Sequence, residues 1–323
     1  MKQMQLTNRF KRIIKPELII FIFLILSIIA GVLLSPNFLD ASFLLSSTTL
    51  QAELGLIAVA FTLLMTAGEI DLSVASNMTL VACIIAVLYQ KGINMVLLII
   101  LGLIIGTILG FINGILVTAT KLPSLIITIG TMSVYKGLAQ VLVGDAAISG
   151  FPEWFIGIDD KMVFKIVPIP LVILIVVGII TELVLKNTFF GRKVTAIGLN
   201  KEAARYSAVD VDKIKIFLFS LQGLFCAVAG IMSISRLEVA KYSIGTGGEL
   251  DVITMVLLGG TAFSGGKGRT LGTLLAFFVL VFIRTGMRLA IFSNYSQIAV
   301  IGALLIITMI ISQKIEEFSK DLI

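Results

Sequence analysis

NMVLLIILGLIIGTILGFINGILV, residues 94–117, holds no charged side chain. A helix needs about 20 predominantly apolar residues to cross the hydrocarbon core of a bilayer, so this stretch is long enough to span one. Nine further apolar runs are separated by Gly, Pro, Asn or charged residues and lie near 18–34, 50–67, 74–89, 122–143, 164–185, 216–234, 250–263, 271–289 and 298–312. The pattern predicts an all-α, polytopic membrane protein, a helical bundle of about ten transmembrane spans.

The composition agrees with this class. Of 323 residues, 58% are hydrophobic and 14% are charged, and the mean hydropathy is +1.10, which is too apolar for a soluble protein. Ten spans leave only short loops, so we expect residues 1–323 to form a single transmembrane domain. The run at 250–263 is short and ends in Gly259 and Gly260. It is either a re-entrant segment or half of a broken helix, and such segments line cavities.

The distribution of basic residues predicts the orientation. With the N-terminus inside, Lys and Arg divide 17 to 6 in favour of the cytoplasmic loops, as the positive-inside rule requires. The formal net charge of +6 is therefore explained without a nucleic-acid partner. Five basic residues precede the first run, namely Lys2, Arg9, Lys11, Arg12 and Lys15. No small-x-small cleavage site follows that run, so we interpret it as a retained span with both termini cytoplasmic.

Few residues suit catalysis. The chain has no histidine, which removes the usual general base and the commonest metal ligand. Cys83 and Cys226 fall in separate apolar runs and are expected to be small buried residues. An intramembrane enzyme would need an activated nucleophile and base, or metal ligands. We expect no catalytic residue, no metal and no cofactor on this chain.

The longest polar loop, about residues 186–215, contains seven basic residues: Lys186, Arg192, Lys193, Lys201, Arg205, Lys213 and Lys215. Asn200 can cap a short helix, and Glu202 favours its first turn. Helical spacing then places Ala203, Ala204, Ser207 and Ala208 on one face of small residues, to which a partner could approach closely while Lys201 and Arg205 set the register. The alternative is a solvated basic loop without a partner.

Polar residues near or within the spans are candidates for a transport path or gate. Asp71 and Ser73 lie in a short segment between two apolar runs, where they are either ion-coupling acids of a secondary transporter or the cap of the next helix at the cytoplasmic face. Asn113 and Gln222 lie inside spans and either bind a polyol or hydrogen-bond between helices. Arg284 is deep in a span and needs a partner, a watery cavity or a route to the interface.

The segment from Gly259 to Gly268 is rich in glycine but does not fit a phosphate-binding loop. The Walker pattern places its first Gly five positions before the second and a Ser or Thr after the Lys. Thr261 stands at the first of these positions, and Gly268 follows Lys267. We expect a re-entrant turn near the transport path, with Gly259 and Gly260 at the gate.

Five segments, in order and nearly from end to end, resemble the permease subunits of ribose-type bacterial ABC importers. They are Ser35–Phe38, Gly68–Ser76, Lys121–Pro123 with Thr128, Gly130 and Thr131, Gly198–Asp210, and Gly248–Asp251 continued by Leu258–Gly268 with Gly272 and Thr273. Glu69, Ala75 and Ala208 replace residues that are more usually Gly in that family. These departures are similar to the branch for rhamnose or autoinducer-2 as much as to the ribose branch.

The resemblance implies a function and a set of partners. A second copy or homologue of the permease would complete the channel, ABC ATPase subunits would bind ATP and Mg, and an extracytoplasmic solute-binding protein would deliver a sugar-like molecule. The location would be the bacterial cytoplasmic membrane. The loop would contain the coupling helix, with Gly198, Asn200, Glu202, Ala203, Ala204, Arg205 and Ser207 as its contact residues. An ion-coupled secondary transporter is the alternative, although the acids here cluster at span ends and loops.

Overall fold

The computed structural model describes residues 16–158 and 161–320, so the basic residues 2–15 lie outside the described part. The helices are α2 (Pro16–Leu34), α3 (Ala41–Thr49), α4 (Ala52–Thr66), α5 (Val74–Gln90), α6 (Met95–Thr120), α7 (Ser124–Val143), α8 (Ile169–Asn187), α9 (Phe189–Leu199), α10 (Lys201–Tyr206), α11 (Val211–Leu237), α12 (Gly248–Leu258), α13 (Thr270–Leu289) and α14 (Asn294–Lys320). A 3-10 turn, η1, covers Pro36–Leu39. Two antiparallel pairs of short strands join β1 (Ile148–Ser149) to β4 (Val239–Ala240) and β2 (Met162–Val163) to β3 (Val167–Pro168).

The chain is mostly helical, and each of the predicted apolar runs overlaps a helix. The predicted count of about ten spans is not confirmed. Within the described residues, five helices are long and apolar enough to cross a membrane: α6, α7, α8, α11 and α13. A sixth span results if α3 and α4, bent by 62°, are counted together. Among the other predicted runs, α5 and α12 are shorter than a full crossing, with 17 and 11 residues.

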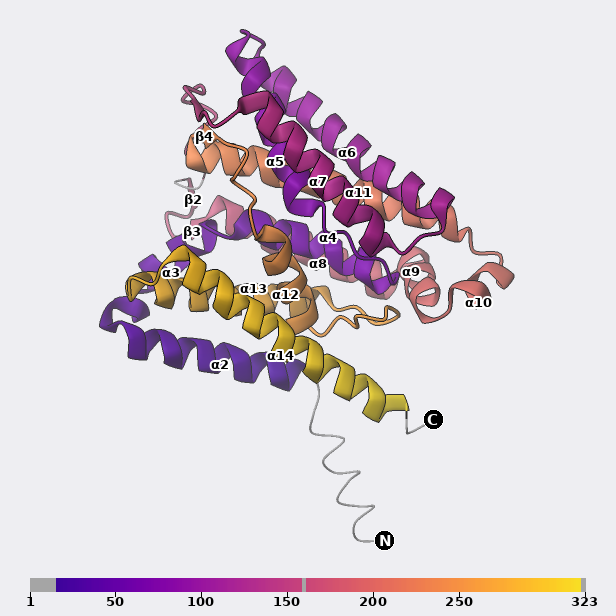
Figure 1. The fold of residues 1–323 in the computed structure, drawn as a ribbon. Coiled ribbons are helices and arrows are strands. Elements are labelled where there is room, and N and C mark those ends of the chain that lie inside the picture. Colours follow the sequence, from indigo (N-terminus) through magenta and orange to yellow (C-terminus); the bar gives the residue numbers. More distant parts are fainter. Residues whose placement is uncertain (1–15, 159–160, 321–323) are drawn as a thin grey trace.

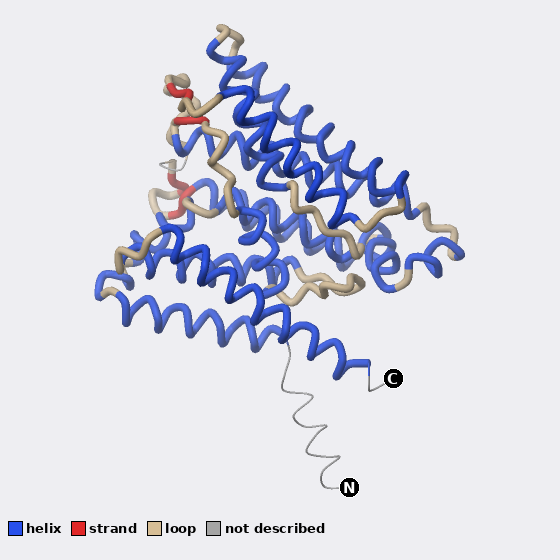
Figure 2. The backbone as a smooth tube through the Cα atoms, viewed as in Figure 1, coloured by secondary structure: helices blue, strands red, loops and turns tan. Residues whose placement is uncertain are grey.

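Opposite ends of the bundle carry different structures. Figure 2 shows the short strands at one end and the helices α9 and α10 at the other. In Figure 1, α5, α6, α7 and α11 run together in one part of the bundle, while α2 and α14 lie along the opposite side. The largest hydrophobic core lies between these groups and includes Leu56, Phe61, Val256 and Phe277, each at most 2% exposed.

A stripe of glycines explains why α6 packs closely on α11. Gly102, Gly106, Gly110 and Gly114 recur every fourth residue of α6, and a Cβ built on Gly110 would lie 2.2 Å from the carbonyl oxygen of Phe219 in α11. Small residues at such spacing let membrane helices approach through their backbones. The α6–α11 contact is therefore closer than any larger side chain at Gly110 would allow.

One helix begins inside the bundle. After α4 ends at Thr66, the backbone N–H of Ile70 donates to Ser124 Oγ (3.0 Å) and that of Leu72 donates to Thr128 Oγ1 (3.1 Å). Thr128 is one turn further along α7 than Ser124, so this segment runs back beside α7 before α5 starts. Ser73, at the beginning of α5, is fully buried. The start of α5 is therefore enclosed by the bundle, and we call the segment between α4 and α5 the break before α5.

The predicted re-entrant or broken segment at 250–263 contains the short helix α12, which ends at Leu258, followed by a loop to Thr270. A Cβ built on Gly272 would lie 1.9 Å from the carbonyl oxygen of Gly259, so the end of α12 touches the beginning of α13 through backbone atoms. Irregular backbone of this kind is tolerated at membrane depth only where protein or water surrounds it. The two breaks, before α5 and after α12, are thus both enclosed by the bundle.

Candidate functional site

The polar loop folds into α9, α10 and the first turn of α11. Asn200 caps α10 as predicted, since its Oδ1 accepts a hydrogen bond from the backbone N–H of Ala203 at 3.0 Å. The helix ends at Tyr206 and does not continue to Ala208. Ala208 has a φ of 59°, a left-handed conformation that a side chain disfavours and glycine accepts. This conformation explains why glycine suits the position in the permeases that this loop resembles.

The predicted face of small residues is only partly correct. Ala203, Ser207 and Ala208 are exposed, but Ala204 is 4% exposed and belongs to a hydrophobic core with Val194, Ile197 and Leu218. Ala204 therefore fixes α10 to the bundle and is not open to a partner. Because α10 has only six residues, at least one of its side chains must pack against the bundle to hold the helix in place.

Two exposed apolar residues at this end escaped the sequence analysis. Tyr206 is 90% exposed and Leu199 is 66% exposed. Tyr206 is the last residue of α10, and Leu199 is the last residue of α9 where the chain turns into α10. The signal in the sequence was a large apolar side chain on either side of the charged segment Lys201–Arg205.

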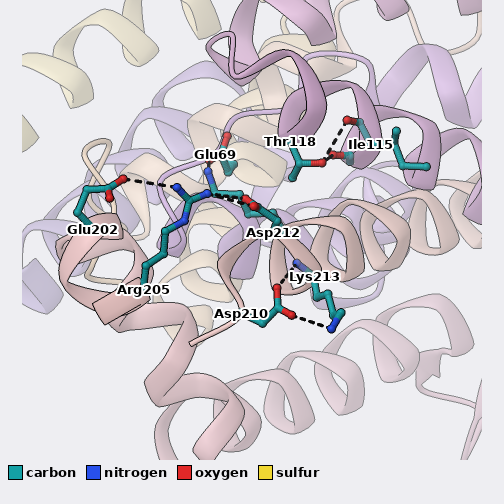
Figure 3. Close-up of polar contacts among 10 residues, drawn as sticks. Glu69, Ile115, Thr118, Glu202, Arg205, Asp210, Asp212 and Lys213 are labelled. Carbon is teal, nitrogen blue, oxygen red and sulfur yellow. Dashed lines mark hydrogen bonds and ion pairs between the residues drawn. The ribbon is translucent and has the colours of Figure 1, made fainter. Parts of the chain in front are cut away.

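Ion pairs fasten α10 to α11. Arg205 Nη2 donates to both carboxylate oxygens of Asp212, at 2.9 and 3.1 Å, and Nη1 lies 3.6 Å from Glu202 Oε1. In Figure 3 the Arg205 side chain reaches from α10 to Asp212 with Glu202 on its other side. Arg205 therefore joins the two helices, and its guanidinium is engaged within the chain.

A second exposed pair caps α11. Asp210 Oδ1 accepts from the backbone N–H of Lys213 at 3.2 Å, and Asp210 Oδ2 lies 2.8 Å from Lys213 Nζ (Figure 3). Hydrogen bonding from the Lys213 side chain lowers the pKa of Asp210. Both groups keep their charges at neutral pH, where a carboxylate at a helix N-terminus is favourable.

A buried ion pair links the loop to the break before α5. Lys215 Nζ pairs with Glu69 Oε1, and the two residues are 5% and 7% exposed. Desolvation, followed by repulsion from Lys215, lowers the pKa of the neighbouring Lys201. Lys215 is therefore part of the interior and not of the solvated loop. Glu69, which departs from the usual Gly of the resembled family, has its counter-ion on α11.

Four glycines bring three separate segments into backbone contact, and we call Gly68, Gly198, Gly265 and Gly266 the glycine junction. The backbone N–H of Gly266 donates to the carbonyl oxygen of Thr66 at 2.8 Å. A Cβ on Gly198 would lie 2.0 Å from that same oxygen, and a Cβ on Gly265 would lie 2.8 Å from Gly68 Cα. A Cβ at Gly198, Gly265 or Gly266 would overlap a neighbouring atom, and the φ of 80° at Gly68 disfavours any side chain. The α9–α10 unit therefore touches both breaks in the bundle.

Three of the predicted path residues form one buried network. Asp71 Oδ1 accepts from the backbone N–H and the Oγ of Ser73, at 2.8 and 2.6 Å. Asn113 Nδ2 donates to Ser73 Oγ at 2.8 Å, and the Tyr135 hydroxyl donates to Asn113 Oδ1 at 3.2 Å. All four residues are at most 4% exposed. The network joins α5, α6 and α7 immediately beyond the segment that carries Glu69.

The remaining path candidates lie elsewhere. Gln222 is fully buried, and its Nε2 donates to the carbonyl oxygen of Ile57 at 3.4 Å, which fits a hydrogen bond between helices. Gly259 allows the close contact of α12 with α13 described above, and Gly260 has a φ of 84° where the following loop starts. Gln222 and Gly259 thus each take part in a contact between helices.

Arg284, which lies deep in a predicted span, pairs with an acid on the short helix α12. Its Nη2 lies 2.8 and 2.7 Å from the two oxygens of Asp251 in the first turn of α12. The sequence analysis did not foresee the pairing. The sequence did offer a signal for Asp251 itself, because Gly68-Glu-Ile-Asp71 is repeated as Gly248-Glu-Leu-Asp251. The two copies adjoin the N-terminal ends of α5 and α12, the helices that start at or near the breaks.

These features define a polytopic helical membrane protein with internally broken helices and an anchored, exposed helix at one end. The chain belongs to the family described as the permease component of branched-chain amino acid transport systems, whose model matches residues 43–309. The membrane-permease class predicted from the resemblance is thereby confirmed. This chain is a transport component, not an enzyme, and the family supports an ABC permease and not the ion-coupled alternative.

Two curated relatives align with nearly the whole chain. The ribose import permease protein of Bacillus subtilis (strain 168) is 36% identical over 319 residues, which cover 97% of this chain and 99% of that protein. The autoinducer 2 import system permease protein of Escherichia coli (strain K12) is 34% identical over 300 residues, which cover 91% of each chain. No solved structure matches the chain significantly.

Proposed function

We propose that this chain is the channel subunit of an ATP-driven importer for a monosaccharide or sugar-like solute of the ribose, rhamnose or autoinducer-2 type. The names of the two relatives support this cargo class. The whole chain, residues 1–323, acts as one membrane domain in the bacterial cytoplasmic membrane. The 17 to 6 distribution of Lys and Arg supports placing both termini and the α9–α10 end in the cytoplasm.

The proposed partners follow from the membership in this family. ABC ATPase subunits bind ATP and Mg below the membrane, a solute-binding protein delivers cargo from the other side, and a second permease copy or homologue completes the channel. The ATPase docks on α10. One observation carries this assignment. Tyr206 and Leu199 are exposed, while Ala204 and the Arg205–Asp212 pair hold α10 against the rest of the protein.

The contacts that hold α10 in place also give a route by which its movement reaches other helices. A displacement of α10 is transmitted to α11 through Arg205 and Asp212, and to the segment before α5 through the glycine junction and the Glu69–Lys215 pair. That segment leads directly into the Asp71 network. In Figure 1, α10 stands at the edge of the bundle while α5 and α12 lie within it. ATP-driven movement at the edge would thus alter the packing around the buried breaks.

A paired substitution tests the docking site. Tyr206→Asp places a charge on the exposed tip, and Tyr295→Asp makes the same change at an 85% exposed tyrosine at the start of α14. We expect Tyr206→Asp to reduce both ATPase co-purification and solute uptake at least tenfold at equal permease abundance in the membrane. Tyr295→Asp should leave ATPase co-purification unchanged. An intact complex and normal uptake in Tyr206→Asp would exclude docking at α10.

The charge on Glu202 offers a second measurement. Glu202→Arg replaces the acid beside Arg205 with a second cation on the same exposed turn. Fewer ATPase subunits should then co-purify, while the melting temperature of the permease alone stays within a few degrees of wild type because an exposed pair contributes little to stability.

The ligand that co-purifies with the partner solute-binding protein identifies the cargo.

A further inference from the structure

An apolar groove opens between α8 and α11 beside the α9 helix. Its volume is about 800 Å³, within the range of about 300–1,000 Å³ typical of ligand pockets. Val177 and Ile180 of α8 face Phe217, Leu221 and Phe225 of α11 across it, and Leu63 of α4 also lines it. Both α8 and α11 are long and apolar enough to span a membrane. The groove is therefore a slot for hydrocarbon bounded by membrane helices.

The polar lining of the groove collects at its α9 end. Lys193, Asp210 and Lys213 all line this end. Lys213 is paired with Asp210, whereas Lys193 has no ion pair or hydrogen bond within the described part of the chain. One carboxylate therefore faces two ammonium groups, and the end of the groove carries a net positive charge.

The α9 helix has the features of a helix that lies in a membrane interface. Phe189 at its start is 79% exposed, and the Arg192 guanidinium lies 4.3 Å from the centre of the Phe189 ring. Val194 and Ile197 on another face of α9 are buried in the core. A helix with basic residues beside an exposed aromatic suits the boundary between headgroups and acyl chains. The charged end of the groove is thus at headgroup level.

We propose that this groove binds an anionic phospholipid, with an acyl chain between α8 and α11 and the headgroup phosphate at Lys193 and Lys213. Basic pockets between membrane helices on the cytoplasmic side are suited to such headgroups. Charge complementarity favours an anionic lipid over a zwitterionic one. The bound lipid contacts α9 and α11, the two helices that flank α10, and this assignment is independent of the transported solute.

Native mass spectrometry of the full-length permease, titrated with phosphatidylglycerol and with phosphatidylcholine, tests the site. We expect wild type to bind phosphatidylglycerol more tightly. Each lysine near an anionic headgroup contributes about a fivefold change in affinity, so Lys193→Gln with Lys213→Gln should weaken phosphatidylglycerol binding about thirtyfold. Phosphatidylcholine, whose choline cation offsets the charge of its phosphate, should lose much less affinity, and its continued binding shows that the double variant is folded.

Two controls separate this site from the general charge of the protein. Lys121→Gln removes one exposed cation at the end of α6, outside the groove, and should leave both affinities unchanged. Val184→Trp fills the groove from α8 and should weaken the binding of both lipids while all basic residues remain. Equal phosphatidylglycerol affinity in wild type and the double lysine variant would overturn the proposal.

A second copy of the chain is the competing occupant. Phe217 lines the groove and is 52% exposed, so Phe217→Cys places an accessible thiol there, while the native Cys83 and Cys226 are buried. In lipid nanodiscs, a short bifunctional maleimide should not join two Phe217→Cys chains if lipid fills the groove. Efficient cross-linking through this residue would place another permease there and would also overturn the lipid assignment.

Discussion

Removing the ammonium of Lys215 tests whether the start of α11 is tied to the break before α5. Lys215→Met keeps most of the side-chain stem and leaves the Glu69 carboxylate, 7% exposed, without its counter-ion. Breaking a buried pair by deleting one partner costs about 3–5 kcal/mol, because the remaining charge is poorly solvated. At about 2–4 °C per kcal/mol, a loss of about 3 kcal/mol lowers Tm by about 6–12 °C.

Glu69→Gln removes the other charge and should be similarly destabilising, since Lys215 is 5% exposed. The variant with both substitutions leaves no unpaired charge and should be more stable than either single variant. The interaction energy from the double-mutant cycle is expected to be about 2 kcal/mol or more, near the upper part of the range for contacting residues. Arg205→Gln with Asp212→Asn is a matched control at an exposed pair, where the coupling should be below about 1 kcal/mol.

The two buried cysteines provide the assay. Cys83 and Cys226 are both inaccessible in the folded protein, so a thiol-reactive fluorescent dye reports their exposure as the purified permease is heated. The variants Lys215→Met, Glu69→Gln and the double variant are melted in parallel with wild type. Strictly additive shifts in Tm, or single variants that melt within about 1 °C of wild type, would refute the buried link between α11 and the break before α5.

The same melting assay checks two backbone predictions. Gly110→Ala should lower Tm by several degrees, because its Cβ would lie 2.2 Å from the carbonyl oxygen of Phe219 and overpacking costs about 1–3 kcal/mol. Gly130→Ala, where nothing lies within 4 Å of the added Cβ, should leave Tm unchanged or slightly higher, and equal effects at the two sites would contradict the close contact of α6 with α11. Ala208→Gly should raise Tm by a few degrees, since the φ of 59° costs a non-glycine residue about 1–2 kcal/mol; a lower Tm would show that this conformation is not strained.

The predicted features that held were local ones. Apolar runs located the helices, and Asn200 was recognised as a cap because capping depends on residues only three positions apart. The face of α10 was misjudged at Ala204 because helical spacing says which residues share a face but not whether that face meets solvent or core. The identity of the residue does not decide this either, because alanine is small enough to lie in the core or on the surface.

The predicted path residues illustrate a second limit. Asp71, Ser73 and Asn113 were chosen because polar groups in apolar runs need a reason, and the structure does bring them together. Gln222 satisfied the same criterion, and its Nε2 donates to the carbonyl oxygen of Ile57 in α4. A buried polar atom needs a hydrogen-bond partner in either case, so polarity alone does not distinguish a transport path from helix packing.

Sequence by itself determined that this is a helical membrane protein with a capped basic loop, because hydropathy and capping act over a few neighbouring residues. Tertiary structure alone decided which runs form helices long enough to cross a bilayer, since an apolar run does not show where its helix begins and ends. It also decided the partners of the buried charges. Glu69 and Lys215 are 146 positions apart, and only the packing of α11 against the break before α5 makes them an ion pair.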